Sequence, residues 1–108
     1  MTKKNVHDNG IDTRIQQLFD EEGSHILAII RNVLYCDRSV IPVMHGELDI
    51  LKLYSYGSIG IEEVKSSEKG IPKARDQMLR AQQVFKFYDP ETVIYIAESK
   101  RVIKDGRY

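Results

Sequence analysis

The stretch GELDILKLYSYGSIGIEEVK, residues 46–65, decides the fold class, because it contains two runs of residues with the side-chain alternation of β-strands. The first run covers residues 47–54 and the second covers residues 59–65. The turn-forming residues 56–58 lie between them. Two such runs joined by a short turn predict a pair of antiparallel strands.

The residues before this pair predict two helices and a further strand. Residues 39–43 are β-like and lead into the pair through residues 44–46, which predicts a hairpin. Apolar residues at helical spacing predict helices at 11–19 and 26–34. Gly23-Ser24 between them is compatible with a break or with a bend in one long helix.

The residues after the pair predict a helix and then a strand. Pro72 lies where the first turn of a helix over residues 73–88 is expected, and Asp89-Pro90 ends that helix. A β run follows at residues 92–97, and Val102-Ile103 is compatible with a short edge strand. The order of elements predicts an α/β domain in which helices flank a mixed central β-sheet: an antiparallel meander, then a helical crossover to a further strand.

Length and composition limit the classes of protein that fit. The 108 residues suffice for one domain, which we expect at residues 11–108 after a flexible polar arm at residues 1–10. Sixteen basic and sixteen acidic side chains cancel, so a uniformly basic nucleic-acid-binding domain is excluded. One cysteine permits no internal disulfide, and no apolar run is long enough for a membrane span or a signal peptide. We therefore expect a cytoplasmic protein.

The strand pair also carries a group of charged residues. Alternation places Glu47 and Asp49 on one face of their strand, opposite Leu48 and Ile50, and it places Glu63 and Lys65 together on theirs. Antiparallel pairing brings Asp49 and Glu63 side by side. Two convergent carboxylates suit Mg²⁺ or Mn²⁺, and a nearby ammonium group orients or deprotonates a water molecule. The alternative is a set of solvent-facing charges, with Lys65 paired to Glu63.

Asp49 on one strand and Glu63-Val64-Lys65 on the next, followed by a helix and another strand, resemble the PD-(D/E)XK nuclease superfamily. The small archaeal-type Holliday junction resolvases and related virus or plasmid nucleases are the most similar in size and spacing. The resemblance covers residues 20–97, and Leu48 stands where the family has proline. It implies a restriction-endonuclease-like core and a Mg²⁺-dependent (or Mn²⁺-dependent) DNA endonuclease, acting on branched or junction DNA.

The resemblance also implies roles for particular residues. Asp49, Glu63 and the Val64 carbonyl would bind the metal, and Lys65 would position or activate the attacking water. A further ligand from the first core helix would be Glu22, with Glu21 and His25 as alternatives. Glu62 is expected to point away from the site. The basic segment after the catalytic strand would contact DNA through Ser66, Lys69, Lys73, Arg75, Gln77 and Arg80.

Two other functions fit the same residues. One is a non-catalytic DNA-binding or interaction module on this fold, and the other is a structural protein in which Asp49, Glu63 and Lys65 form an ion-pair network. We expect a homodimer, because a small chain has little surface to hold a branched duplex and two-fold symmetry supplies two sites. The strand at residues 93–96, Phe85 and Phe87 are the surfaces suggested for it.

Overall fold

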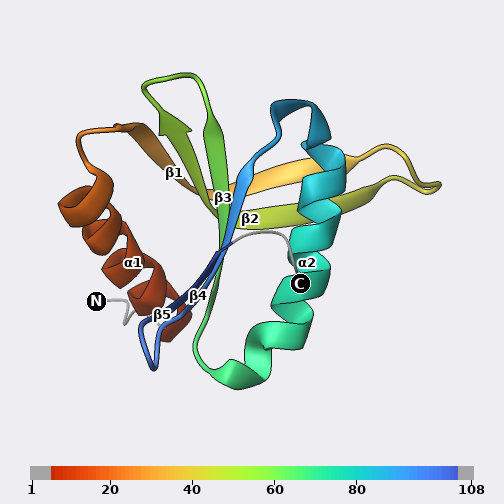
Figure 1. The fold of residues 1–108 in the computed structure, drawn as a ribbon. Helices are drawn as coiled ribbons and strands as arrows, with labels where there is room; N and C mark the ends of the chain where they lie inside the picture. Colours follow the sequence, from red (N-terminus) through yellow and green to blue (C-terminus); the bar gives the residue numbers. More distant parts are fainter. Residues whose placement is uncertain (1–5, 105–108) are drawn as a thin grey trace, which may run out of the picture.

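The computed structural model describes residues 6–104, in which a five-stranded sheet separates two helices (Figure 1). The chain begins with one helix, continues through three strands, and crosses over by a second helix to two more strands. The elements are α1 Val6–Glu22, β1 Ile26–Asp37, β2 Met44–Tyr54, β3 Ile59–Lys65, α2 Ile71–Val84, β4 Glu91–Ile96 and β5 Arg101–Lys104, with the 3₁₀ turns η1 Glu68–Gly70 and η2 Lys86–Tyr88 on either side of α2.

The sheet has the topology that the strand pattern predicts. Its order is β1-β2-β3-β4-β5, and only the β3–β4 pair is parallel. A parallel pair needs a crossover connection, which α2 supplies. The α/β class, the mixed sheet, the antiparallel meander and the short edge strand at Val102-Ile103 are therefore confirmed.

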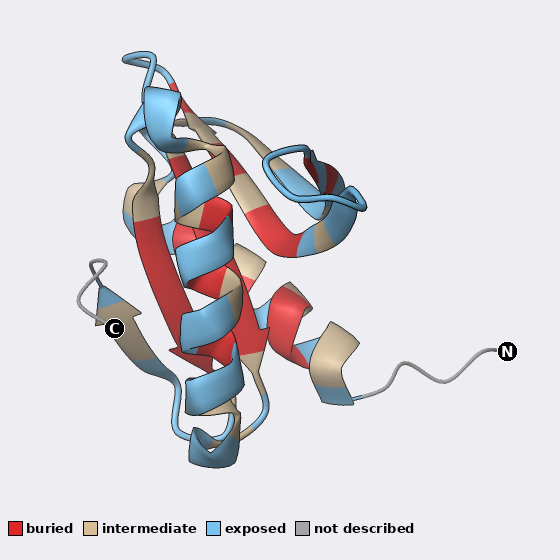
Figure 2. Ribbon diagram, turned by 90° about the vertical axis from the view of Figure 1, so that its right-hand side faces the viewer, coloured by how far each residue is buried: buried red, intermediate tan, exposed pale blue. Residues whose placement is uncertain are grey.

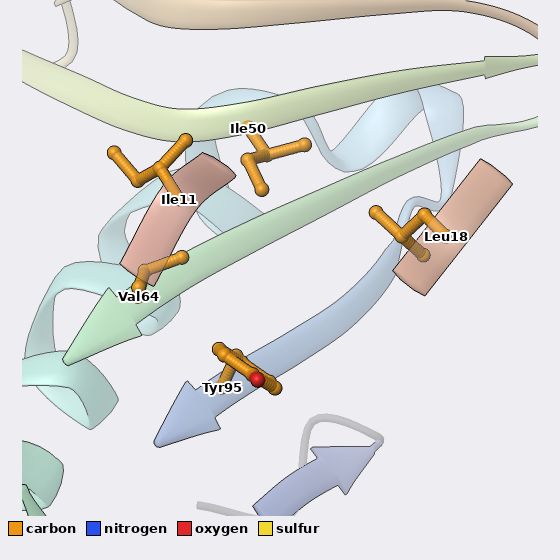
Figure 3. Close-up of a cluster of buried hydrophobic side chains, with 5 residues drawn as sticks. All are labelled: Ile11, Leu18, Ile50, Val64 and Tyr95. Carbon is orange, nitrogen blue, oxygen red and sulfur yellow. The ribbon is translucent and has the colours of Figure 1, made fainter. Parts of the chain in front are cut away.

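Each face of the sheet packs against one helix. On the α1 side, Ile11 and Leu18 of the helix contact Ile50, Val64 and Tyr95 of three neighbouring strands (Figure 3). On the other side, α2 contributes buried Ala74, Met78 and Ala81, which cover β3 and β4 while its outer face stays exposed (Figure 2). Consecutive residues of the central strands therefore enter different layers.

Two predicted elements are wrong, and the α-helical part of a third is shorter than predicted. Residues 26–34 form β1 rather than a helix, because their β-branched residues pair with β2 along its whole length. Residues 39–43 are the connection of the hairpin, and residues 44–46 belong to β2, since Asp37 pairs with Met44. The predicted helix 73–88 is α2 followed by η2, with Pro72 in the first turn as expected.

The predicted flexible arm is also wrong over residues 6–10, which form the start of α1; residues 1–5 lie outside the described part of the chain. Gly10, the last residue of the predicted arm, is buried where the helix approaches the sheet. A Cβ atom there would lie 3.1 Å from the Cβ of Ala97 and 3.2 Å from Cγ1 of Val64. The small residue lets α1 lie close to the end of β3.

The alternation of side chains along β2 is interrupted at Asp49. Leu48 packs with the α2-side cluster and Ile50 with the α1-side cluster, so the expectation that both face one side is wrong. The residue opposite Asp49 in the β1 register, Asn32, has a left-handed backbone conformation (φ 53°).

A buried ionic network lies between α1 and the sheet. Glu62 accepts hydrogen bonds from Arg14 at 2.6 and 3.0 Å and forms an ion pair with Lys52 at 2.7 Å. All three side chains are at least 97% buried, and Glu91 lies 3.3 Å from Lys52 at the edge of the network. Burial lowers the pKa of Lys52, but the neighbouring Glu62 outweighs it, so the net pKa is raised and the group stays charged.

No helix within residues 6–104 has the length and apolar character needed to cross a membrane.

We expect Glu62→Gln to lower the free energy of unfolding by about 3–5 kcal/mol, because it leaves two buried cations without their shared carboxylate. Urea denaturation at pH 7 measures the loss. Glu68→Gln is the matched control: it removes only the exposed pair with Arg101, so its cost should stay below about 1 kcal/mol. Similar, small losses in both variants would show that the network does not stabilise the fold.

Candidate active site

Asp49 and Glu63 face each other where the β2–β3 ladder ends. The last registered pair is Ile50 with Glu62, and the next position of the same register sets Asp49 opposite Glu63. Side chains directly opposite on antiparallel strands have Cβ atoms about 5 Å apart. Both residues are buried, with 7% of Asp49 and 2% of Glu63 exposed, so the alternative of solvent-facing charges is wrong for both carboxyl groups.

Asp49 is held by two partners. Its Oδ2 accepts a hydrogen bond of 2.8 Å from the backbone N–H of Val64, which replaces the ladder bond missing at this position. Its Oδ1 lies 3.1 Å from Nε2 of His7 in the first turns of α1. The carboxylate is thus fixed in orientation by both β3 and α1.

Glu63 has an unusual environment for a carboxyl group. Burial raises its pKa to about 9, together with the negative charge of Asp49 and a hydrogen bond to that residue. The positive charge of Lys65 opposes the shift. Its Oε1 is buried and has no hydrogen-bond partner within the described chain. At neutral pH the Asp49–Glu63 pair therefore holds a proton and presents a free carboxyl oxygen.

Lys65 lies two residues beyond Glu63, on the same face of β3. Its side-chain stem passes over the start of α2: a Cβ atom on Gly70 would come within 2.8 Å of its Cβ and Cγ. Val64 points the other way, into the α1-side cluster. The predicted grouping of Glu63 with Lys65 is therefore correct, and so is the placement of Glu62, which binds Arg14 on the opposite face.

These residues fit a divalent cation. Asp49 and Glu63 supply oxygen ligands, and the carbonyl of Val64 points to the same side of β3 as its N–H, toward Asp49. Within residues 6–104, no group of three His, Cys, Asp or Glu side chains is arranged to hold a metal on its own. Water molecules would have to complete the coordination, as is usual for Mg²⁺.

The structure does not bring Glu22 to this site, and that expectation is wrong. Glu22 ends α1, fifteen residues after His7, which is about 22 Å along the helix axis. Its negative charge contributes to the raised pKa values of Arg14 in α1 and of Tyr54 at the far end of β2. Glu21 also acts on Arg14, and His25 contacts the ring of Tyr56, so neither alternative reaches Asp49.

His7 is the residue of α1 that does reach the site, and sequence reasoning missed it. It falls in the segment read as an arm, and the neighbouring Val6 is exposed, so no apolar periodicity marks the start of the helix. The acidic Asp8 in the first turn is the available signal for a helix start there.

Three of the predicted DNA-contacting residues share one flank of α2. Lys73, Gln77 and Arg80 are spaced i, i+4 and i+7, which places them in one row. This row faces the hairpin, because Arg80 is close enough to β1 for its positive charge to favour the ionised forms of Tyr35 and Asp37. The negative charge of Glu63 also contributes to the pKa of Tyr35, so Tyr35 lies near both Arg80 and Glu63. The row therefore lies beside the two carboxyl groups. The buried Oε1 of Gln77 has no hydrogen-bond partner among residues 6–104.

The other predicted contacts lie elsewhere around the site. Arg75 is on the opposite flank of α2, in one row with Gln82. Gln82 donates a hydrogen bond of 3.3 Å to Thr92, so this flank faces β4. Lys69 is exposed in η1. Ser66 is exposed beyond the end of β3, where its carbonyl accepts a hydrogen bond from the N–H of Glu98.

Comparison with known families and proteins gives no match: no protein-family model matches the sequence, and neither does any curated protein. Any assignment of activity to this chain therefore rests on its own residues and their arrangement.

The raised pKa of Glu63 makes the stability of the fold depend on pH in a defined direction. In the unfolded chain Glu63 loses its proton near its ordinary pKa of 4.5, whereas the folded, metal-free protein keeps it up to about pH 9. The folded state binds more protons between these values, so this group makes stability fall as pH rises from 5 to 9. We expect Glu63→Gln to remove that slope, measured by urea denaturation in EDTA at several pH values. Parallel profiles for wild type and variant would contradict the shift.

Proposed function

We propose that this protein is a divalent-metal-dependent endodeoxyribonuclease of the PD-(D/E)XK type. The observation that carries the proposal is the Asp49–Glu63 pair, which combines two facing carboxyl groups, a buried oxygen that no group of the described chain hydrogen-bonds, and Lys65 on the same face as Glu63. Two ionised carboxylates are costly in a buried position unless a proton or a cation compensates them. The structural ion-pair network of the fold is formed instead by Arg14, Lys52 and Glu62.

The arrangement of elements supports a restriction-endonuclease-like core. The order α1-β1-β2-β3-α2-β4 matches the helix, three strands, helix and strand of that superfamily. The two acidic residues lie on the adjacent antiparallel strands β2 and β3, and β4 continues the sheet in parallel with β3. Leu48 in place of the family's proline packs with Ile61 and Met78, which is a structural use of that position.

Each residue of the site then has a defined task. Asp49, Glu63 and the Val64 carbonyl would hold Mg²⁺ or Mn²⁺, and a bound cation lowers the pKa of a water molecule and stabilises charge on the scissile phosphate. Lys65 orients the attacking water and supplies positive charge beside Glu63. The N–H of Val64 and the ring of His7 keep the Asp49 carboxylate in one orientation.

DNA would approach along the row formed by Lys73, Gln77 and Arg80, which binds phosphates without reading sequence. A homodimer stays part of the proposal, since two sites related by a two-fold axis would cut both strands of a symmetric junction. The strand at residues 93–96 cannot form its interface, because those side chains are fully buried. Phe85 is partly buried against Tyr35, whereas Phe87 is 90% exposed and remains available.

Cleavage assays test the proposal with supercoiled plasmid, linear duplex and a four-way junction, each in Mg²⁺, in Mn²⁺ and in EDTA. We expect metal-dependent cleavage that Asp49→Asn and Glu63→Gln each abolish, because each variant removes one anionic ligand. Both variants should fold, since the amide oxygen introduced by Asp49→Asn still accepts the hydrogen bond from Val64, and Glu63→Gln leaves no charge to bury. Undiminished metal-dependent cleavage by either purified variant would contradict the assignment.

Lys65→Ala separates catalysis from binding in the same assay. We expect the single-turnover rate to fall by a factor on the order of 10²–10⁴ while DNA affinity changes little, because the lysine acts on the water. Lys69→Ala is the matched control: it removes an exposed lysine nearby and should change affinity more than rate. DNA binding without cleavage in any metal would favour the non-catalytic module.

A further inference from the structure

The connection between β1 and β2 exposes an unusual concentration of apolar side chains. It joins Asp37 to Met44, the last pair of the hairpin. Ile41, in the middle of this connection, is 100% exposed, and Val40, Val43 and Met44 are each about 40% exposed. We call these four residues the apolar tip. Exposed side chains grouped in this way are a marker of a binding surface, since they gain nothing from the core.

The surroundings of the apolar tip are suited to a polyanion. No acidic residue occurs between Arg38 and Gly46. Asp37, just before the tip, is 8% exposed and accepts a hydrogen bond of 3.0 Å from the N–H of Ser39. A groove of about 250 Å³ beside the base of the tip is lined by two basic residues, Arg38 and Lys86, and by one acidic residue, Asp37. Basic side chains around an apolar point favour nucleic acid over an uncharged partner.

The distance between the tip and the carboxylates matches the dimensions of a duplex. Met44 precedes Asp49 by five residues of β2, which corresponds to about 17 Å along an extended strand. That is half of the roughly 34 Å helical repeat of B-DNA. A duplex whose phosphate lies at Asp49 and Glu63 therefore presents its grooves to the tip about half a turn away.

We propose that the apolar tip is a wedge, which inserts Ile41 and its neighbours at a base step of the bound DNA and unstacks it. The inference rests on the nuclease function proposed above and adds a second contact, to bases, at a distance from the cut. Apolar side chains inserted between base steps kink DNA at a cost of a few kcal/mol per step. Such a wedge favours DNA that is already unpaired or flexible at that position, because less unstacking has to be done.

The experiment uses the full chain, with Ca²⁺ replacing Mg²⁺, and 30-base-pair duplexes that each carry one 2-aminopurine. The tip variant is Ile41→Ser combined with Val43→Ser. Leu27→Ser is the matched control, because Leu27 is 72% exposed at the other end of β1. We expect wild type and Leu27→Ser to raise the fluorescence of 2-aminopurine on binding, and the tip variant to lose that rise.

A mismatch placed beside the 2-aminopurine provides a second test. In Mg²⁺ we expect the tip variant to cut the fully paired duplex about tenfold more slowly than wild type and to regain most of that loss on the mismatched duplex, where unstacking is already done. Cutting with no fluorescence rise, or an unchanged rise in the tip variant, overturns the wedge and leaves the nuclease intact. Absence of DNA binding overturns both. A wild-type dimer that becomes monomeric in the tip variant, by sedimentation, assigns the tip to a second copy and overturns the wedge.

Discussion

The mutual repulsion of two carboxyl groups, held face to face by the register of β2 and β3, is the constraint on which the site depends. Burial leaves little water to screen Asp49 from Glu63, so the two cannot both ionise without a compensating charge. In the metal-free chain a proton compensates the pair. The same position offers a divalent cation a fixed Asp49 and a free oxygen of Glu63.

Two consecutive glutamates of β3 meet opposite environments because the strand lies between two layers. Glu62 points to α1, where Arg14 and Lys52 neutralise it and fix the helix on the sheet. Glu63 points to the α2 side, where burial and then the neighbouring Asp49 raise its pKa. A one-residue slip of β3 would exchange the two carboxylates, so the network at Glu62 also secures the register that places Glu63 opposite Asp49.

Strand alternation predicted the central features because β3 is regular. The pairing of Asp49 with Glu63, the shared face with Lys65 and the position of Glu62 on the opposite face all follow from period two at residues 59–65. The pattern failed for β1, whose apolar residues fit a helical and an extended reading equally, and whose pairing with β2 decides between them. The pattern also failed to place His7 in a helix. An exposed Val6 and a glycine, Gly10, are typical of a flexible arm, although Gly10 here allows the helix to pack closely on the sheet.

Calorimetric titration with Mn²⁺ at pH 7, in two buffers of different ionisation enthalpy, tests the central claim most directly. If the cation replaces the proton that the raised pKa leaves on Glu63, binding should release close to one proton per site, and Glu63→Gln should abolish that release. Binding with the same proton count in wild type and Glu63→Gln, or no binding at millimolar metal, would contradict the account of this pair as a metal site.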